Sequence, residues 1–487
     1  MGLPAAVNRP LRVVAPTLVL LVGAAARIAP LADNRFHPDE ALFASYGRLI
    51  STGDWNLATR LVDKPPLSFY LMAGAFMRIG PNEIAARLPG LAASLLSLAL
   101  VWHLAMRLWR DRTVALLAMV FFALSPMAVL FAPTAFTDPL LVLWLLAALA
   151  SAAGGRWGWT GIFVGLAAST KQTALFFLPL VVAVGLSGRA GWPPDWRGLA
   201  RFLLPVGVTA GLLAAWEGTR GPVLGFWQVG VANNAPGGLV PPGELWPRLL
   251  AWGNWLRALG GWPPANVALV LGLVALAGGD LRRWRTRAAR LDLGLAAFTL
   301  AYFAAYWLVG FNVYDRYLLP LVPLVGLLLA RALAVVWPRR TALAVLALAG
   351  LMAWPALRAA RSGYPVGGDH GAHDGIDEIA AYLDGLPAGT VFYDHWLGWP
   401  LDFYLFDSPA YTTYFATPED LAAELRELSG RRPAVLLLPA WVEHDGVLDA
   451  VSGAGYEAGL VFHTTNRFGE RNLLVLRLTR PEPGDSG

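Results

Sequence analysis

The residues best suited to chemistry lie in a polar, charged segment, residues 33–87, between two apolar stretches. This segment contains an acidic pair, Asp39 and Glu40, and further on a turn in which Lys64 precedes two prolines. A carboxylate can take a proton from a hydroxyl group, and a compact ammonium group is a common binder of phosphate. The combination predicts a site that brings a hydroxyl acceptor to a substrate with a phosphate leaving group.

Lysine is scarce in this chain, because only Lys64 and Lys171 occur among its 38 Lys and Arg residues. The prolines after Lys64 restrict the backbone and would hold that side chain in place. Lys171 interrupts the apolar stretch of residues 159–186. A solvated turn for Lys64 and snorkelling to the membrane interface for Lys171 are the plain alternatives. We interpret both lysines as ligands of a donor phosphate.

Three more polar residues, Arg87, Arg316 and Tyr317, stand where polar segments meet apolar stretches. A charge inside a membrane span costs roughly 2.5–3.5 kcal/mol on insertion scales, so such residues usually face a cavity. Anchoring at the membrane interface is the alternative for Arg87 and Tyr317, and Arg316 could pair locally with Asp315. We interpret Arg316, with the adjacent Tyr317, as a further contact to the donor phosphate; for Arg87 that role comes only from the family resemblance given below.

The carboxylates and His37 are assigned to two roles, base catalysis and acceptor binding. Asp39 is assigned as the general base with Glu40 as its partner, and the alternative is an acidic pair stabilised by a helix N-terminus. Asp138 and His37 are assigned to acceptor binding or positioning, although Asp138 could simply cap a helix. Because His37 has no partner at metal-ligand spacing, we expect no metal site and no cofactor; a divalent cation is compatible with the carboxylates but not indicated.

The composition predicts an integral membrane protein. The chain is 56% hydrophobic and only 15% charged, with a mean hydropathy of +0.51, whereas a soluble domain carries about 25% charged residues. The net charge of +5 does not indicate nucleic-acid binding, because the arginines cluster in short loops between apolar stretches. Cysteine is absent, which excludes disulfides, thiolate metal sites and thiol nucleophiles.

The apolar stretches predict about eleven membrane spans. They are Leu11–Ala32, Leu88–Ala105, Val114–Ala128, Pro139–Ala153, Trp159–Leu186, Phe202–Trp216, Pro264–Gly278, Leu291–Val309, Tyr317–Val336 and Thr341–Ala359. Arginine-rich short loops, such as residues 107–112 and 282–290, belong in the cytoplasm. All of these loops can lie in the cytoplasm only if the stretch around Lys171 crosses the membrane twice, as two short helices, or dips into it and returns. We therefore expect a multi-pass protein of the bacterial inner (plasma) membrane, with residues 33–87, a loop of residues 217–261 and the tail outside.

The composition changes after Arg361, and the tail predicts a small extracytoplasmic α/β domain, residues 361–487, after a membrane domain of residues 1–360. Helical patterns alternate with strand-like runs. The expected helices are Ile376–Leu386, Pro418–Leu428 and Val442–Val451, and the expected strands are Thr390–Tyr393, Ala434–Leu438 and Leu473–Leu478. A loose cluster of His370 and His373 with Asp369 and Asp374 opens the tail, and we interpret it as a solvated linker, with an adventitious metal site as the alternative.

Several short motifs, in this order, resemble bacterial membrane glycosyltransferases related to protein O-mannosyltransferases, a group with the GT-C fold. This group includes the lipid A aminoarabinose transferase and the rhizobial galacturonosyltransferases. The motifs are HPDEALFA (His37–Ala44), DKPPLSFYL (Asp63–Leu71), NEIAARLPG (Asn82–Gly90), ALSP (Ala123–Pro126), TDPLL (Thr137–Leu141), GLAASTKQTALFFLPL (Gly165–Leu180) and YDRYLLPLVP (Tyr314–Pro323).

The resemblance implies a transferase that moves a sugar from a polyprenyl-phosphate donor to a lipid, glycan or protein acceptor, with inversion and without a nucleotide-sugar. It gives Asp39 the base or acceptor-orienting role and gives Arg87 a contact to the carrier phosphate. Lys64, Lys171 and Arg316 match basic positions assigned to the lipid phosphate. Where the acceptor of a family member is already an anionic phosphate, no base is needed.

Two other classes of protein compete with the transferase. A flippase or transporter of lipid-linked sugars places polar groups near the bilayer midplane, often on broken helices in paired repeats. Lys171 favours this alternative, whereas most other polar groups lie in outer loops and no repeat is evident. A non-catalytic assembly scaffold would not need carboxylates and cations gathered together.

Overall fold

The computed structural model describes residues 8–187, 196–234, 237–338, 340–410 and 412–481, and it divides into two compact units. Unit 1 comprises Met1–Asp33 and Gly47–Gly367, and unit 2 comprises Asn34–Tyr46 and Gly368–Gly487. The sequence analysis expected a boundary near residue 361 and kept all of residues 33–87 with the membrane part. The structure differs in one important respect: Asn34–Tyr46, which carries the acidic pair, belongs to the same unit as the tail.

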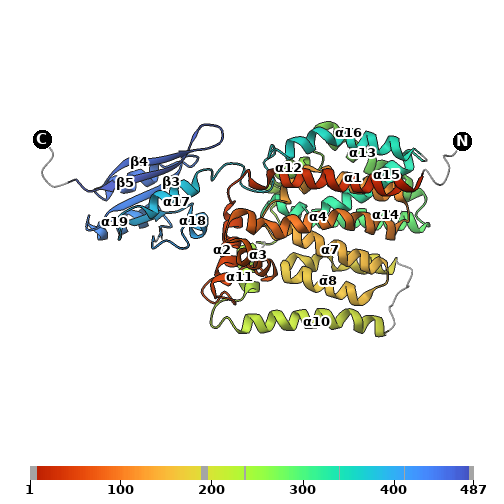
Figure 1. Ribbon diagram of the computed structural model, residues 1–487, viewed down its shortest axis with the longest axis horizontal. Helices are drawn as coiled ribbons and strands as arrows, with labels where there is room; N and C mark the ends of the chain where they lie inside the picture. Colours follow the sequence, from red (N-terminus) through yellow and green to blue (C-terminus); the bar gives the residue numbers. More distant parts are fainter. Residues whose placement is uncertain (1–7, 188–195, 235–236, 339, 411, 482–487) are drawn as a thin grey trace. The chain divides into compact units, whose positions relative to one another are not determined.

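Unit 1 is built from helices, and its long helices lie side by side with nearly parallel axes (Figure 1). The helices are α1 (Asn8–Ile28), η1 (Ala29–Ala32), α3 (Leu67–Ile79), α4 (Glu83–Leu108), α5 (Arg112–Leu124), α6 (Pro126–Phe131), α7 (Asp138–Ala153), α8 (Trp157–Thr170), η2 (Gln172–Phe177), α9 (Leu178–Leu186), α10 (Trp196–Gly218), α11 (Phe226–Asn234), α12 (Pro242–Leu256), η3 (Arg257–Leu259), α13 (Pro263–Arg282), α14 (Arg287–Leu308), η4 (Asp315–Leu318), α15 (Leu321–Val336) and α16 (Thr341–Ala359). Helix α2 (Pro38–Thr52) begins in unit 2 and ends in unit 1.

The helices of unit 1 confirm a polytopic membrane protein. Among the described residues, six helices are long and apolar enough to cross a membrane, and five shorter helices of 10–17 residues are also apolar. The predicted break inside residues 159–186 is present, because α8 ends at Thr170, Lys171 is extended, and η2 begins at Gln172. The stretch therefore forms two short segments, α8 and η2–α9, as the distribution of arginines required.

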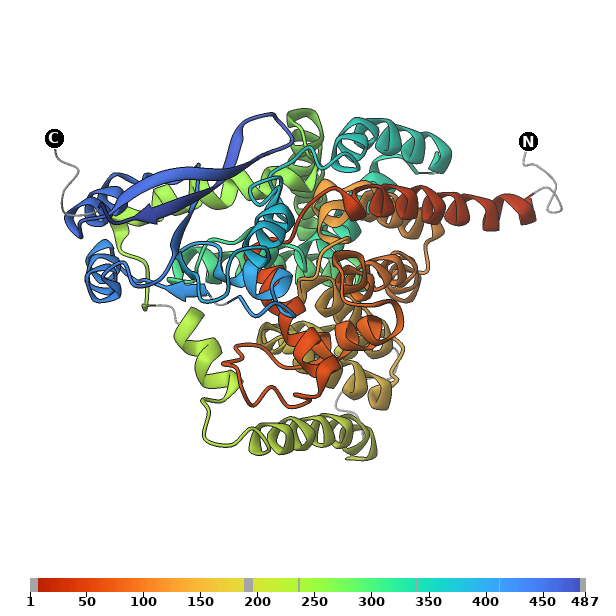
Figure 2. The same cartoon turned by 60° about the vertical axis from the view of Figure 1, so that its left-hand side comes forward.

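Helix α7 lies at the centre of the bundle, where it packs against α4, α8 and α9. It is apolar on all sides, which suits a helix that is surrounded by protein. Gly90 allows α4 to pack closely against the segment that precedes α7, since a Cβ atom at Gly90 would lie 2.5 Å from the carbonyl oxygen of Thr134. In contrast, α10 packs mainly on α8 and lies at the edge of the bundle in both views (Figures 1 and 2).

The segment of residues 217–261, expected to be an outer loop, is largely helical. Prolines begin α12, where their fixed φ and missing N–H are tolerated. Apolar side chains such as Val229 in α11 and Trp252 in α12 are buried and hold both helices against the bundle. The expectation of a loop was wrong because glycine and proline dominate the composition here, while a few buried residues determine the fold.

Unit 2 contains a five-stranded mixed sheet in the order β2-β1-β3-β5-β4. The strands are β1 (Val391–Asp394), β2 (Thr412–Tyr414), β3 (Ala434–Pro439), β4 (Glu457–Thr465) and β5 (Arg471–Thr479). β1 pairs in parallel with β2 and β3, and β5 runs antiparallel to β3 and β4. The last two strands form a long hairpin that is visible in both views (Figures 1 and 2).

Helices cover both faces of this sheet. They are α17 (Ile376–Asp384), α18 (Gly398–Tyr404), α19 (Pro418–Leu428) and α20 (Asp445–Gly453). Alternate residues of β3 point to opposite faces, so that Leu436 packs with α19 and α20, while Val435 and Leu437 pack with α17 and α18. The sheet is therefore buried on both sides, which gives unit 2 its own hydrophobic core.

The predicted α/β tail is confirmed, with two strands that the sequence analysis missed. The three expected helices and three expected strands correspond to α17, α19, α20, β1, β3 and β5. Strand β2 has only three residues, and β4 lies at the edge of the sheet with most of its residues exposed. Neither strand therefore shows the alternation of buried and exposed residues that identifies a strand in a sequence.

Candidate active site

A cavity of about 270 Å³ opens in unit 1. It is lined by the break between α8 and η2, by η2 itself, by α11, by the end of α14 and by η4. Most of its wall is apolar or aromatic, as with Phe176, Trp227 and Phe311. Lys64 and Lys171, the two lysines of the chain, both line it. Among the described residues that line this cavity, these two carry a positive charge and none carries a negative one.

Lys171 lies at the break between α8 and η2 and is held by a buried ion pair. Its Nζ atom donates to Oδ1 of Asp138 at 2.7 Å, and the two side chains are only 3% and 2% exposed. Asp138 begins α7, so the antiparallel packing of α7 and α8 brings the two residues together. A buried pair of this kind needs good geometry to offset the loss of water around both charges.

Two further groups from η4 surround this pair. The Nζ atom of Lys171 lies 5.0 Å from the ring centre of Tyr317, which is a cation–π distance. The guanidinium carbon of Arg316 lies 4.3 Å from the ring centre of Tyr314 and 6.0 Å from that of Tyr317. Arg316 and Lys64 both lie close enough to Lys171 to repel its charge. The site therefore collects three cations within one region of unit 1.

Lys64 reaches the cavity from the turn that precedes α3. Its ammonium group forms an ion pair with the neighbouring Asp63, and both side chains are largely buried. Gln172 fixes this turn, because its Nε2 atom donates to the Asp63 carbonyl oxygen at 2.8 Å. Gly230 of α11 lies beside both groups: a Cβ atom there would come within 2.7 Å of the Asp63 carbonyl and of the Gln172 amide. The turn with Lys64 is thus packed between η2 and α11.

Arg87 is fully buried near the start of α4, but it is not among the described residues that line the cavity. Its Nη1 atom donates to the carbonyl oxygen of Leu31, which lies in η1 at the end of the first span. The observed contact joins α4 to the first span. The proposed contact of Arg87 with the carrier phosphate stays a prediction.

Residues 34–46, which carry Asp39 and Glu40 and are called the acidic segment from here on, belong to unit 2 and include the start of α2. The backbone N–H of His37 donates to Oε2 of Glu40 at 3.2 Å, and the backbone N–H of Asp39 donates to Nδ1 of His37 at 3.2 Å. Glu40 is completely buried, whereas Asp39 and His37 are partly exposed. The segment is therefore a tightly bonded helix start that leaves Asp39 accessible. The roles assigned to these three residues stay predictions.

Comparison with known proteins supports the expected family. Residues 63–204 match the profile of the family described as dolichyl-phosphate-mannose-protein mannosyltransferase. Over 182 residues, 34% of this chain, the sequence is 34% identical to the undecaprenyl phosphate-alpha-4-amino-4-deoxy-L-arabinose arabinosyl transferase of Enterobacter sp. strain 638. The protein of the same name from Erwinia tasmaniensis is 30% identical over 217 residues, 41% of this chain. The matched segments span only 33% and 37% of the length of these two relatives.

Solved structures resemble the chain over almost its whole length. ArnT from Cupriavidus metallidurans covers 97% of this chain and 98% of its own, with a TM-score of 0.63 in the apo state and 0.60 bound to undecaprenyl phosphate. The identities are 18% and 17%. The chain has the GT-C fold and is related to the ArnT and protein mannosyltransferase families. The oligosaccharyltransferase of Archaeoglobus fulgidus also resembles it, with a TM-score of 0.52 at 14% identity, over 94% of this chain and 72% of that one.

Several residues around this cavity were missed in the sequence analysis. Asn234 of α11 accepts a hydrogen bond of 2.9 Å from the Tyr317 hydroxyl, and it also lines the cavity. Arg248 of α12 donates to the carbonyl oxygens of Tyr306 at 3.1 Å and Phe311 at 2.7 Å, which fixes the wall formed by the end of α14. Both residues come from the segment expected to be a loop, and no local pattern marks them.

The structure offers no group of three or more His, Cys, Asp or Glu side chains that could hold a metal ion, within the residues it describes. The cluster at the start of the tail, interpreted as a solvated linker, is buried at two of its four residues, Asp369 and His373. The Nδ1 atom of His373 lies 2.5 Å from Oδ1 of Asp369, and both side chains are at most 5% exposed. The linker interpretation was wrong because the carboxylate satisfies the histidine and allows its burial.

Proposed function

We propose that this chain is an integral membrane glycosyltransferase that moves a sugar from a polyprenyl-phosphate donor to an acceptor outside the cytoplasm. The observation that carries the proposal is the cavity whose wall is apolar and whose only charged lining residues, among those described, are Lys64 and Lys171. A ligand with an anionic head and an apolar body fits such a wall, and a polyprenyl phosphate has both parts.

The positions of the carboxylates support an anion in this cavity. Asp63 and Asp138 pair with the two lysines but do not themselves line the cavity. They fix the ammonium groups and reduce the cost of burying them, while the cavity keeps its positive face. Arg316 adds a third cation close to Lys171. These cations would hold the oxygens of the departing phosphate as negative charge develops there.

The chemistry is a single displacement at the anomeric carbon of the donor sugar. The acceptor oxygen forms a bond to that carbon while the bond to the phosphate oxygen breaks, and polyprenyl phosphate leaves with the electron pair. The acceptor proton passes to the Asp39 carboxylate, and Glu40, which binds the His37 backbone, keeps the helix start in place. The configuration of the anomeric carbon is inverted. With an acceptor that is already a phosphate anion, Asp39 positions the acceptor and takes no proton.

The proposed orientation places this site and unit 2 outside the cytoplasm, in the inner membrane of a bacterium. The placement of arginines in short loops supports this orientation. Partners are then a polyprenyl-phosphate-linked sugar, a lipid, glycan or protein acceptor, and the membrane lipids. We propose no nucleic-acid partner and no cofactor.

A transfer assay tests the proposed function. The purified full-length protein in lipid nanodiscs is incubated with undecaprenyl-phosphate sugars and an extract of bacterial envelope lipids, glycans and proteins, and the products are identified by mass spectrometry. We expect one donor to be consumed and its sugar to appear on an acceptor. Movement of the donor between leaflets of a proteoliposome without any transfer would instead support the flippase alternative, for which the break at Lys171 is the structural argument.

A further inference from the structure

Within unit 2, the acidic segment is held by contacts from residues of the tail that are far away in the sequence. Asn34, at the start of the segment, accepts a hydrogen bond of 2.9 Å from Nη1 of Arg467, which lies 433 positions further along the chain. Arg35 forms an ion pair of 2.7 Å with Asp377 of α17. Phe36 is completely buried and meets the ring of Phe403 edge to face, at 4.9 Å between ring centres.

Arg467 is the centre of this arrangement. It lies in the turn between β4 and β5, and its guanidinium group binds both carboxylate oxygens of Asp374, at 2.7 Å and 2.8 Å. The backbone N–H of Arg467 also donates to Asp374 at 3.0 Å. Burial acts to raise the pKa of Asp374, but the hydrogen bonds and charge of Arg467 outweigh it and hold that pKa below its ordinary value. The remaining arm of the guanidinium reaches Asn34.

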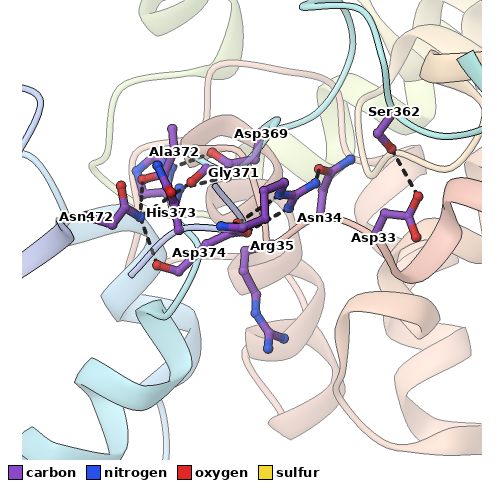
Figure 3. A network of polar contacts seen from close by, with 12 residues as sticks. Asp33, Asn34, Arg35, Ser362, Asp369, Gly371, Ala372, His373, Asp374 and Asn472 are labelled. Carbon is purple, nitrogen blue, oxygen red and sulfur yellow. Dashed lines mark hydrogen bonds and ion pairs between the residues drawn. The ribbon is translucent and has the colours of Figure 1, made fainter. Parts of the chain in front are cut away.

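The loop that carries Asp374 is itself fixed to the sheet. The Nδ2 atom of Asn472, in β5, donates to the carbonyl oxygens of Ala372 at 3.0 Å and Asp374 at 2.9 Å. Within the loop, the backbone N–H of His373 donates to Asp369 at 2.7 Å. Figure 3 shows this loop with Asn34 on one side and Asn472 on the other. A continuous set of hydrogen bonds thus runs from the sheet to the acidic segment.

The hydrophobic cores of unit 2 do not explain these contacts. Its sheet has hydrophobic cores on both faces, and Arg467 belongs to neither of them. An ion pair at the tip of a hairpin contributes little to folding by itself. A bidentate guanidinium–carboxylate pair does, however, fix the direction of the arginine side chain. What this direction determines is the position of Asn34, five residues before Asp39.

We propose that the tail part of unit 2, residues 368–487, positions the acidic segment of the same unit, with Arg467 as the positioning residue that fixes Asn34 and thereby the start of α2. Arg467 touches neither donor nor acceptor and acts through the backbone that carries Asp39. The catalytic consequence rests on the function proposed above; the positioning itself does not.

Hydrogen exchange on the full-length protein tests the positioning without any substrate. In Arg467→Ala, we expect the backbone amides of residues 34–46 to exchange roughly tenfold faster, because one charge-assisted hydrogen bond no longer opposes local opening. Asn34→Ala, which removes only the other end of the bond, should give a similar increase. Arg477→Ala is the matched control, since Arg477 is an exposed arginine of β5, and we expect no change there.

The kinetics give a second readout. Arg467→Ala and Asn34→Ala should each lower kcat for sugar transfer roughly tenfold and leave the KM for the donor unchanged. The double variant should be no slower than either single variant, because both remove the same bond. Arg467→Lys should recover part of the rate, since lysine keeps the charge but not the bidentate geometry.

Unchanged exchange of residues 34–46 in Asn34→Ala would overturn the proposal, and this variant leaves Arg467 and Asp374 intact even if Arg467→Ala fails to fold. Full transfer activity of a folded Arg467→Ala variant would overturn its catalytic part. Absence of transfer by the unaltered protein would contradict the proposed function only, because the exchange result does not depend on activity.

Discussion

Two ion pairs in unit 1, each with a buried carboxylate, are alike in geometry but lie in different surroundings. Lys171 and Asp138 are 2.7 Å apart, and Arg331 and Asp292 are 2.9 Å apart, each pair joining two helices of the bundle. Lys171 lines a cavity and has two further cations nearby. Arg331 packs on the ring of Trp109, at 5.6 Å from its centre.

The pair of Arg331 and Asp292 lies far from the cavity, although α14 contributes to both. Asp292 is near the start of α14, and Tyr306, which lines the cavity, is 14 residues further on, about 21 Å along the helix axis. The comparison teaches that burial of an ion pair does not identify a site. Lys171 differs because it lies with other cations at a cavity that the paired carboxylates, Asp63 and Asp138, do not line.

Unit 2 supplies a third case, a buried carboxylate that is held by backbone N–H groups. Asp394 is the last residue of β1 and accepts hydrogen bonds from the backbone of Trp396 at 3.2 Å and Leu397 at 2.9 Å. Burial raises the pKa of Asp394 to about 6, although these backbone hydrogen bonds and His395 act in the opposite direction. The three carboxylates therefore differ in what compensates for their burial.

The largest effect is expected when one member of a buried pair is removed. Lys171→Met leaves Asp138 as an uncompensated charge and should cost about 3–5 kcal/mol of stability, as should Arg331→Met for Asp292. The double variants Asp138→Leu/Lys171→Met and Asp292→Leu/Arg331→Met should recover most of that stability. Only the first double variant should lose binding of undecaprenyl phosphate. Thermal unfolding and ligand binding measure the two properties separately, and equal binding by both double variants would remove the distinction between the pairs.

The carboxylate of Asp394 predicts a dependence of stability on pH. Its pKa is raised from 3.8 to about 6, so the folded protein binds the proton more tightly than the unfolded chain does. This contribution to stability is fully present below pH 3.8 and is lost as the pH rises to about 6, a change of about 3 kcal/mol. Asp394→Asn should abolish it. The stability of unit 2 in the full-length protein is measured at pH 4 and pH 6 by denaturation, with proteolytic cleavage within unit 2 as the readout. An identical pH dependence in the unaltered protein and in Asp394→Asn would contradict the raised pKa of Asp394.

Removal of Lys64, the second lysine that lines the cavity, should have an intermediate effect. Lys64→Ala should weaken binding of undecaprenyl phosphate roughly 10- to 100-fold, because a charge-assisted hydrogen bond contributes about 1.5–3 kcal/mol. Stability should change less than in Lys171→Met, since Lys64 is paired with its own neighbour. Arg78→Ala, which removes an exposed cation from the end of α3, serves as the control. Equal affinity of the Lys64 and Arg78 variants would exclude Lys64 as a phosphate ligand.

The smallest effect is expected for the Tyr317 hydroxyl. Tyr317→Phe keeps the ring beneath Lys171 but removes the hydrogen bond to Asn234, and it should weaken donor binding by about 0.5–1.5 kcal/mol. Tyr317→Ala removes the ring as well and should weaken binding further. Calorimetry with undecaprenyl phosphate compares the two variants. If Tyr317→Phe were as weak as Tyr317→Ala, the hydroxyl rather than the cation–π contact would be the important group.

The parts of the fold that were predictable are those determined by local pattern. The break at Lys171 was expected because one lysine interrupts an apolar stretch, and the core helices and strands of the tail were expected from their periodicity. Conversely, the segment of α11 and α12 was missed, since its composition suggests a loop while buried contacts make it helical. The edge strand β4 was missed because it lacks alternation.

The parts of the site that were not predictable depend on contacts between distant positions. The cavity unites Lys64 with Lys171, but the partner of Lys171 is known only once α7 and α8 are packed. Likewise, no property of residues 34–46 indicates that they belong with a hairpin more than 400 positions away. Residue types identified the groups that could react, and the packing of helices and sheet determined which of them meet.

The central claim is that Lys64 and Lys171 together hold the phosphate of a polyprenyl carrier. A structure of the protein with bound undecaprenyl phosphate tests it most directly. We predict that the phosphate lies about 3 Å from the Nζ atoms of both lysines and that the polyprenyl chain runs along Phe176 and Trp227. A phosphate bound elsewhere, with this cavity unchanged, would contradict the account.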